Sequence, residues 1–332
     1  MREPSFWWRE PGILSTLLAP FTALYGAIAA LRLRFAGRSA GVPVICIGNL
    51  TVGGAGKTPV ALCVGRLLAD AGQRVFFLSR GYGGKLAGPV RVDSIRHRAS
   101  DVGDEPLLLA RIAPTIVSRD RVAGAELART SGATVIVMDD GFQNPSLHKD
   151  IAIIVIDGGR GIGNGRIIPA GPMRAPLNAQ LGRTHALLVI GEPSASATAV
   201  ITAAAEQHIP VLRAMLEAEA DAVASLAGNQ VLAFAGIGNP EKFFATLAEA
   251  GIPAPVTRAY PDHYRYSALD ADELVTEAAN KNLVLVTTEK DLARIAGAAG
   301  LAALSKAVRA LPVMLQLDEP ETLRELVLRR KP

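Results

Sequence analysis

The chain has 332 residues, 49% of them hydrophobic and 20% charged, with a formal net charge of +4, which excludes a disordered chain and allows two lobes. Two cysteines, Cys46 and Cys63, are too few for a disulfide framework and lack metal-site spacing, so we expect a reducing compartment. No long stripe of basic and aromatic residues is present in the sequence, so nucleic acid is not an expected partner.

The first predicted element is an apolar segment with anchoring residues at both ends. Residues 13–31 carry no charge, Trp7 and Trp8 precede them, and arginines follow within residues 32–38. As one helix the segment would be about 28 Å long, close to the hydrocarbon thickness of about 30 Å. Pro20 makes a full span uncertain, so three alternatives stay open: a spanning helix, a helix lying in the membrane interface, and a buried helix covering a groove. We expect membrane association in each of the first two cases.

A glycine-rich loop follows, between a predicted strand at residues 42–47 and a predicted helix at residues 60–71. Its sequence, GNLTVGGAGKTP at residues 48–59, is typical of loops that wrap nucleotide phosphates. The glycines let backbone N–H groups turn inward, and the helix N-terminus attracts anions. The usual pattern has a glycine where this chain has a threonine, and an ordinary glycine-rich turn is the alternative. The expected phosphate-binding residues are Thr51, Val52, Gly53, Gly54, Ala55, Gly56, Lys57 and Thr58.

A second motif, at the end of a predicted strand over residues 134–138, indicates a magnesium site. The strand ends in Asp139 and Asp140, and carboxylates at such a position hold Mg²⁺ in phosphate-loop enzymes. Lys57 would reach the β- and γ-phosphates, and the Thr58 hydroxyl would be a further metal ligand. The alternative is that the two acids only begin a turn.

Apolar runs alternate with helical patterns through the rest of the chain, which predicts an α/β fold. The expected architecture is a parallel sheet of the P-loop NTPase type, flanked by helices, with a smaller α/β C-terminal lobe. The remaining strands expected in the larger sheet are residues 74–79, 151–156 and 186–190, and its further helices are residues 106–113, 121–131 and a stretch within 195–205. A second series comprises strands at residues 231–235, 283–287 and 313–317 and a helix at residues 241–250.

These patterns divide the chain into three parts. Residues 1–37 form the N-terminal helix, residues 38–225 the nucleotide-binding core, and residues 226–332 the smaller lobe. A polar, small-residue stretch at residues 217–229 is the expected hinge.

The ordered set of motifs resembles one family, the tetraacyldisaccharide 4′-kinases, which are the lipid A kinases of Gram-negative envelopes. The resemblance implies transfer of the ATP γ-phosphate, with Mg²⁺, to the 4′-hydroxyl of an acylated glucosamine disaccharide 1-phosphate. It also implies attachment to the inner membrane on its cytoplasmic face, and it makes Thr51 the family's own form of the loop. The runs that carry it are GNLTVGGAGKTP (48–59), LSRGYGG (78–84), VGDEPLLLA (102–110), SRDRVAGA (118–125), VIVMDDGFQNPSL (135–147), IPAGPMR (168–174), AFAGIGNPEKFF (233–244), YPDHYRY (260–266) and LVTTEKDLAR (285–294).

Within the resemblance, Asp104 and His263 match the pair that handles the proton of the acceptor hydroxyl, and Lys57 completes the catalytic set. A carboxylate can orient an imidazole, or take the proton itself while the imidazole stabilises it, and the residues do not decide between these roles. The plainer interpretations are that Asp104 caps a helix and that His263 is an ordinary loop residue.

Several further positions stay open. Residues 287–291 fit helix capping at least as well as catalysis. Ala175 stands where members of the family often have an acid, so any role of that acid is in doubt here. Four residues could contact phosphate or sugar: Arg80, Tyr82, Arg119 and Arg121.

Two other functions fit the loop. One is a membrane-attached P-loop ATPase or switch, and the other is a kinase for another lipid-linked alcohol. A GTP switch would need an Asn/Thr-Lys-x-Asp motif, and here Lys290 and Asp291 are adjacent. The uncharged N-terminal segment favours a membrane-borne substrate.

Overall fold

The computed structural model describes residues 3–328 and contains two sheets. The strands of the larger sheet are β1 (Val44–Asn49), β2 (Val75–Ser79), β3 (Val90–Arg91), β4 (Thr115–Val117), β5 (Val135–Asp139), β6 (Ile151–Asp157), β7 (Ala186–Ile190), β8 (Val211–Ala218) and β13 (Val313–Leu317). Those of the smaller sheet are β9 (Val231–Ala235), β10 (Val256–Ala259), β11 (Val284–Thr287) and β12 (Arg309–Ala310).

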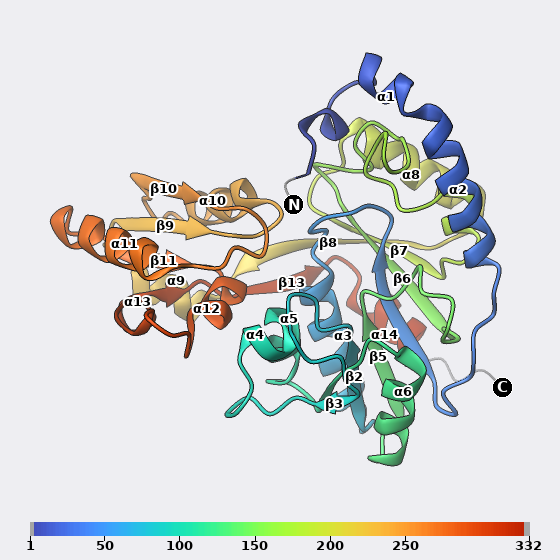
Figure 1. Ribbon diagram of the computed structural model, residues 1–332, viewed down its shortest axis with the longest axis horizontal. Helices are drawn as coiled ribbons and strands as arrows, with labels where there is room; N and C mark the ends of the chain where they lie inside the picture. The colour runs from blue at the N-terminus through green and yellow to red at the C-terminus, as the bar shows by residue number, and fades with distance from the viewer. Residues whose placement is uncertain (1–2, 329–332) are drawn as a thin grey trace.

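Helices surround both sheets, so the molecule has two α/β lobes (Figure 1). The larger lobe carries η1 (Ser5–Trp8), α1 (Ile13–Leu17), α2 (Ala19–Leu33), α3 (Lys57–Asp70), α4 (Ala99–Val102), α5 (Asp104–Leu109), α6 (Arg121–Thr130), α7 (Leu177–Leu181), α8 (Ala195–Glu206) and α14 (Pro320–Leu328). The smaller lobe carries α9 (Ala220–Leu226), α10 (Pro240–Glu249), α11 (Ala268–Asn280), α12 (Glu289–Ile295) and α13 (Ala302–Ala307).

The larger sheet has the order β13-β8-β7-β6-β1-β5-β2-β4-β3, and the smaller one β10-β9-β11-β12. Neighbouring strands are parallel except β13 with β8 and β3 with β4. The predicted fold class, a parallel sheet flanked by helices with a smaller α/β lobe, is confirmed. In the centre, β1 lies between β5 and β6, and Ile47 is paired with Asp139. The phosphate loop and the strand-end acids therefore leave the sheet at the same edge.

The larger sheet is covered on both faces because its central strands are apolar on both sides. In β1, Ile45 and Ile47 pack in the core shared with α3 and α14, while Val44 and Cys46 pack in the core shared with α6 and α8. Burying each such aliphatic side chain contributes about 1.5–3 kcal/mol. A Cβ at Gly65 would lie 2.3 Å from the Phe77 ring, so glycine there allows α3 to approach β2.

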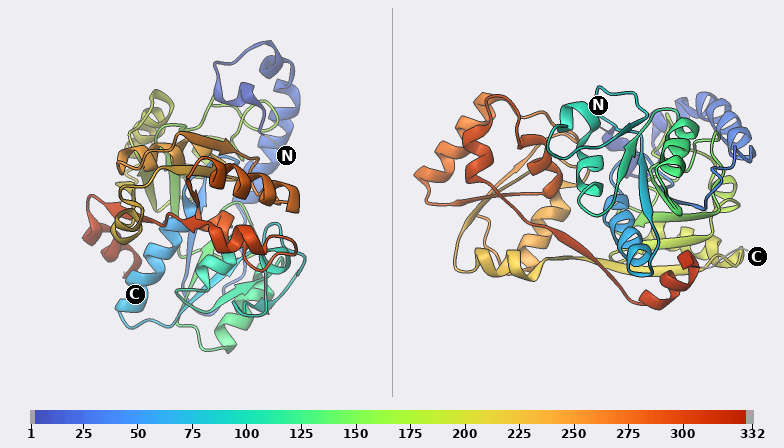
Figure 2. Two further views of the ribbon diagram at one scale, coloured as in Figure 1. Left: turned by 90° about the vertical axis from the view of Figure 1, so that its left-hand side faces the viewer. Right: turned by 90° about the horizontal axis from the view of Figure 1, so that it is seen from below.

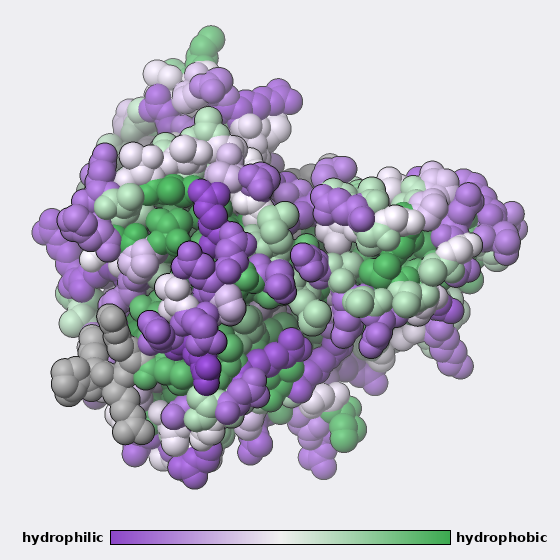
Figure 3. Space-filling view, turned by 180° about the vertical axis from the view of Figure 1, so that it is seen from behind, coloured by the Kyte–Doolittle hydropathy of each residue, from purple (hydrophilic) through white to green (hydrophobic). Residues whose placement is uncertain are grey.

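Two antiparallel strands connect the lobes. In β8 and β13, Ala218 pairs with Val313 and Ala214 with Leu317, and Figure 2 shows β13 crossing back to the larger lobe. From behind, the smaller lobe stands out from the side of the larger one (Figure 3). The residues expected to form a hinge contain the end of β8 and α9.

The prediction that the strand at residues 313–317 belongs to the second series is wrong. This strand joins the larger sheet, and α14 follows it there because Leu323 and Val327 pack in the α3 core. The C-terminal part of the predicted lobe at residues 226–332 is thus placed on the larger lobe as far as residue 328. Residues 1–2 and 329–332 of the predicted ranges lie outside the described residues.

The N-terminal apolar segment consists of two helices, α1 and α2, rather than one. Gly26 and Leu33 are buried, and the Thr22 hydroxyl donates a hydrogen bond of 3.2 Å to the Ile167 carbonyl. Within residues 3–328, no helix combines the length and the apolar character needed to cross a membrane. The buried-helix alternative does not fit α1 and α2, because many apolar side chains of this N-terminal region are more than a third exposed. They are Ile13, Leu14, Leu17, Phe21, Leu24, Tyr25, Ile28, Leu31 and Phe35.

Candidate active site

The phosphate loop is a sharply turned segment between β1 and α3. Gly56, immediately before α3, has φ +84°, and a Cβ there would lie 2.7 Å from Ile190. Glycine is therefore required both by the backbone conformation and by the available space. The loop is tied to the protein by a hydrogen bond of 2.9 Å from the Val52 amide to the Pro172 carbonyl. Its shape presents the N-terminus of a 14-residue helix, which favours anions.

Lys57, the first residue of α3, lies against the strand-end acids. Its Nζ is 3.7 Å from Asp140 Oδ2, and Arg174 Nη1 is 2.7 Å from Asp140 Oδ1. Burial alone would raise the pKa of Asp140, but the charges of Lys57 and Arg174 outweigh it and hold that pKa well below its usual range. Near neutral pH, Asp140 is thus an ionised partner of two cations.

Asp139 and Thr58 contrast with Asp140 because their side-chain oxygens are buried without partners. Among residues 3–328, no group makes a hydrogen bond to either carboxylate oxygen of Asp139 or to Thr58 Oγ1. Burial and the charge of Glu105 together raise the pKa of Asp139 to about 7, and the charge of Lys57 opposes this rise. Unsatisfied buried oxygens of this kind are costly unless a ligand completes them.

These oxygens fit a hard divalent cation. Mg²⁺ is usually held by one or two carboxylates, with phosphate oxygens and waters completing its octahedron. No group of three or more His, Cys, Asp or Glu side chains that could hold a metal occurs in the described part of the chain. A cation here would therefore need Asp139, Thr58 and the oxygens of a bound phosphate together.

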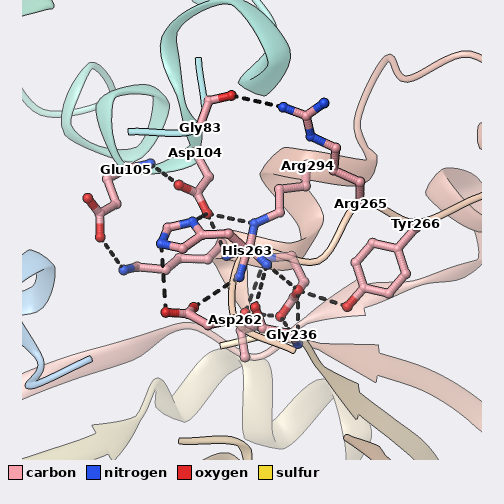
Figure 4. Close-up of polar contacts among 12 residues, drawn as sticks. Gly83, Asp104, Glu105, Gly236, Asp262, His263, Arg265, Tyr266 and Arg294 are labelled. Atoms are coloured by element: carbon pink, nitrogen blue, oxygen red, sulfur yellow. Dashed lines mark hydrogen bonds and ion pairs between the residues drawn. The ribbon is translucent and has the colours of Figure 1, made fainter. Parts of the chain in front are cut away.

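Asp104 and His263 meet across the two lobes (Figure 4). Asp104 begins α5 and is 3% exposed, and its Oδ2 lies 3.4 Å from His263 Nδ1. His263 comes from the loop after β10, with φ +54°, and its amide donates to the Gly236 carbonyl at 3.1 Å. Burial alone would lower the pKa of His263, but the hydrogen bond and charge of Asp104 outweigh it and raise that pKa.

A cavity of about 510 Å³ connects the acids to the N-terminal helix. Glu105, next to Asp104, lines it together with Asp139, and so does Tyr82, whose ring centroid is 4.8 Å from that of His263. At its other end lie Tyr25 and Ile28 of α2, both more than a third exposed. Its arginines are Arg32, Arg80, Arg119, Arg121 and Arg174. The cavity can therefore take a ligand with both anionic and apolar parts.

The four residues predicted to contact phosphate or sugar do not all have free side chains at the cavity. Arg80, Arg119 and Tyr82 line the cavity. Arg121 also borders it but is 2% exposed, and its guanidinium donates to the carbonyls of Ser118 at 2.5 Å and of Asp140 at 3.1 Å. Its contacts hold the loop after β5 in place.

Two residues reach this site from α12: Lys290, in the range 287–291 that the sequence left open between capping and catalysis, and Arg294, to which the sequence assigned no role. Thr288 caps that helix as expected, accepting a hydrogen bond of 3.1 Å from the Asp291 amide. In addition, Lys290 is 2.7 Å from Glu105, and Arg294 Nε is 2.6 Å from Asp104. The sequence signal for this pair is their spacing: Lys290 and Arg294 are four residues apart, which puts both cations on one face of the helix.

Comparisons of this chain with protein families, curated proteins and solved structures all point to one family. The family model described as "Tetraacyldisaccharide-1-P 4'-kinase" matches residues 14–331. A Bradyrhizobium protein named "Tetraacyldisaccharide 4'-kinase" is 53% identical, over 99% of this chain and 95% of its own. A Rhodopseudomonas palustris protein of the same name is 54% identical, over 99% and 96%. A crystal structure described as "apo" LpxK from Aquifex aeolicus in complex with ATP superposes with a TM-score of 0.73 at 29% identity, covering 95% of this chain and 98% of the other.

Proposed function

The chain belongs to the tetraacyldisaccharide 4′-kinase family, and on that premise we propose how its site carries out the reaction. The chain is a kinase that phosphorylates the 4′-hydroxyl of a tetraacylated disaccharide 1-phosphate in lipid A biosynthesis. The phosphoryl donor is ATP, as in the description of the solved relative. The observation that carries the proposed site is the set of unpartnered oxygens of Asp139 and Thr58 beside the phosphate loop.

The nucleotide side of the site is the phosphate loop, Lys57, Thr58 and the acid pair. Backbone amides of residues 51–58 would bind the phosphates, and Lys57 would stabilise the charge on the γ-phosphoryl oxygens. Asp139 and Thr58 would hold Mg²⁺, with Asp140 beside them as the partner of Lys57 and Arg174. When bound, the ion neutralises charge on the β- and γ-phosphates.

The acceptor side is the Asp104–His263 pair. Both oxygens of Asp104 are occupied: Oδ1 accepts from the Glu105 amide at 2.9 Å, and Oδ2 faces Arg294 and His263. With Nδ1–H directed at Asp104, the Nε2 atom of His263 is the acceptor for the hydroxyl proton. This arrangement favours His263 as the general base and Asp104 as the group that orients it.

The part of the site that would bind the lipid is the end of the cavity lined by α2. The acyl chains would lie against the exposed apolar face of α1 and α2, and the cavity arginines would bind the sugar phosphate. We place the enzyme on the cytoplasmic face of the inner membrane, held by these helices in the interface.

The function is tested with ATP labelled in the γ-phosphate, Mg²⁺ and purified tetraacyldisaccharide 1-phosphate. We expect a labelled bisphosphorylated lipid. ATP hydrolysis without labelled lipid would instead support the ATPase alternative, and labelling of a different lipid-linked alcohol in preference would support another acceptor.

Membrane attachment is tested by charge on the exposed face of α2. Phe21 and Leu24 are each 65% exposed, so Phe21→Glu with Leu24→Glu should leave packing intact. Two carboxylates at the interface should remove most binding to vesicles of anionic and zwitterionic phospholipid, measured by flotation.

The matched control places the same two charges elsewhere. Ile95 and Leu269 are 96% and 68% exposed on other surfaces, and Ile95→Glu with Leu269→Glu should float like the unmodified protein. Equal flotation of both double variants would mean that α2 is not the attachment surface.

A further inference from the structure

Arg294 of α12 makes the closest side-chain contacts to Asp104. Its Nε donates a hydrogen bond of 2.6 Å to Asp104 Oδ2, and its Nη2 lies 2.5 Å from the same oxygen. His263 Nδ1 is farther from that oxygen, at 3.4 Å. The Arg294 and Asp104 side chains are 8% and 3% exposed, so the pair is almost fully removed from water (Figure 4). Charge-assisted hydrogen bonds that are shielded from water hold their two side chains in a fixed relative orientation.

Arg294 is itself held rigidly by the smaller lobe. Its Nη1 donates to the Gly236 carbonyl at 2.6 Å and to Asp291 Oδ1 at 2.8 Å. Asp291 is fully buried and accepts hydrogen bonds from the Gly236 amide and the Tyr266 hydroxyl. The guanidinium therefore has one orientation, and the contact continues without a break from the smaller sheet to α5 of the larger lobe.

We propose that Arg294 is a positioning residue: it keeps the Asp104 carboxylate aimed at His263, and so assembles the proton-accepting pair only when the lobes are docked. This inference rests on the proposed function, in which the pair takes the proton of the acceptor hydroxyl. Arg294 acts through Asp104 and does not contact the substrate.

The charges around the pair determine the direction of its pH dependence. The titratable and charged side chains that face it are Lys290, Asp291 and Arg294 of α12, Glu105 of α5, Asp262 and Tyr266 of the neighbouring loop, and Tyr82 of the larger lobe. Burial alone would raise the pKa of Asp104, but the His263 hydrogen bond and the charges of Arg294 and Lys290 outweigh it. The charge of Arg294 also opposes the rise in the pKa of His263. Loss of Arg294 would therefore raise both pKa values.

The test is Arg294→Met in the full-length protein, with the pH dependence of kcat/KM for lipid phosphorylation as readout. Since His263, as the base, must be unprotonated, the acid limb should move to higher pH by about one unit. At neutral pH kcat should fall about tenfold while KM for ATP stays constant. Arg294→Lys keeps the charge and should give an intermediate profile.

Arg111 provides the matched control. It forms another ion pair with α12, in which its Nη1 lies 2.9 Å from Glu289 Oε1, but its side chain is half exposed and does not contact Asp104. Arg111→Met should retain the pH profile of the unmodified enzyme. An equal shift in Arg111→Met would assign the effect to lobe docking in general and overturn the proposal.

A second readout does not depend on turnover. The chain has five histidines, and the His263 imidazole can be assigned by NMR with His263→Gln. Its pKa should be higher in Arg294→Met, and higher to a smaller extent in Arg294→Lys. An unchanged titration and pH profile in folded Arg294→Lys and Arg294→Met protein would overturn the proposal. Another outcome is that the unmodified protein does not phosphorylate the lipid while the His263 pKa is still higher in Arg294→Met. That result would contradict the proposed function and still support the role of Arg294.

Discussion

Lys57→Ala should lower kcat for lipid phosphorylation by about 10²- to 10³-fold, the loss expected when one group that stabilises transition-state charge is removed. Lys57 begins α3 with its ammonium 3.7 Å from Asp140, at the mouth of the phosphate loop. The fold should survive, because Asp140 keeps its contact of 2.7 Å with Arg174. Steady-state kinetics and thermal unfolding of the same preparation measure the two effects separately.

The control for this prediction is Lys281→Ala on the smaller lobe. Lys281 is exposed and pairs with Glu277 at 2.8 Å, so its removal should leave kcat unchanged and cost at most about 0.5 kcal/mol of stability. If Lys57→Ala retained the kcat of this control, Lys57 would not act on the transferred phosphate.

The phosphate loop and the acid pair could be predicted because their signals are local. A strand, a loop with glycines and a helix follow one another within residues 42–71, and Asp139 ends a continuous apolar run. The side chains that complete the site are held by the strands and helices that carry these motifs. The expected positions of these residues therefore follow from spacing alone, and the structure adds their partners, such as Arg174 on Asp140.

The contacts between the lobes could not be predicted in this way. Arg294 and Asp104 are 190 residues apart, and their meeting depends on how two sheets are placed relative to each other. The motif at residues 287–291 fitted helix capping at least as well as catalysis, and capping is a local interaction that says nothing about the other lobe. The same reason explains β13, whose short apolar run predicts a strand but does not say which sheet the strand joins.

For the N-terminal segment, composition predicted a helix but not how that helix packs. A run of uncharged residues predicted a helix close to membrane thickness, but it did not locate the break near Leu18 or the face that packs against the protein. That face depends on partners such as Ile167, more than 130 residues away. Only the structure separates the packed side of α2 from its exposed apolar side.

Asp139→Asn should also lower kcat by about 10²- to 10³-fold, and it should make the protein more stable near neutral pH. The amide has the shape of the carboxylate without its charge, so it should not hold Mg²⁺ with Thr58. In the unmodified protein both oxygens of Asp139 are buried without hydrogen-bond partners in the described residues, which makes the ionised form costly. Replacing it removes that cost.

The pH dependence of this stability difference follows from the pKa of Asp139. Burial raises that pKa to about 7 in the folded state, whereas an unfolded aspartate has a pKa of about 4. Between these values the folded state binds a proton that the unfolded state has lost, so the free energy of unfolding falls as pH rises from about 4 to about 7. Asparagine does not titrate, and the variant should exceed the unmodified protein by about 1–3 kcal/mol at pH 8 but match it near pH 4.

Denaturant unfolding at several pH values, beside kcat, measures both parts of this prediction. Asp272→Asn, an exposed carboxylate of α11, is the control and should change neither quantity. An Asp139→Asn protein that is less stable at pH 8 would mean that the carboxylate has a stabilising partner in the folded protein. One that keeps full kcat would remove Asp139 from the metal site, because a neutral amide cannot replace the charge that holds the cation.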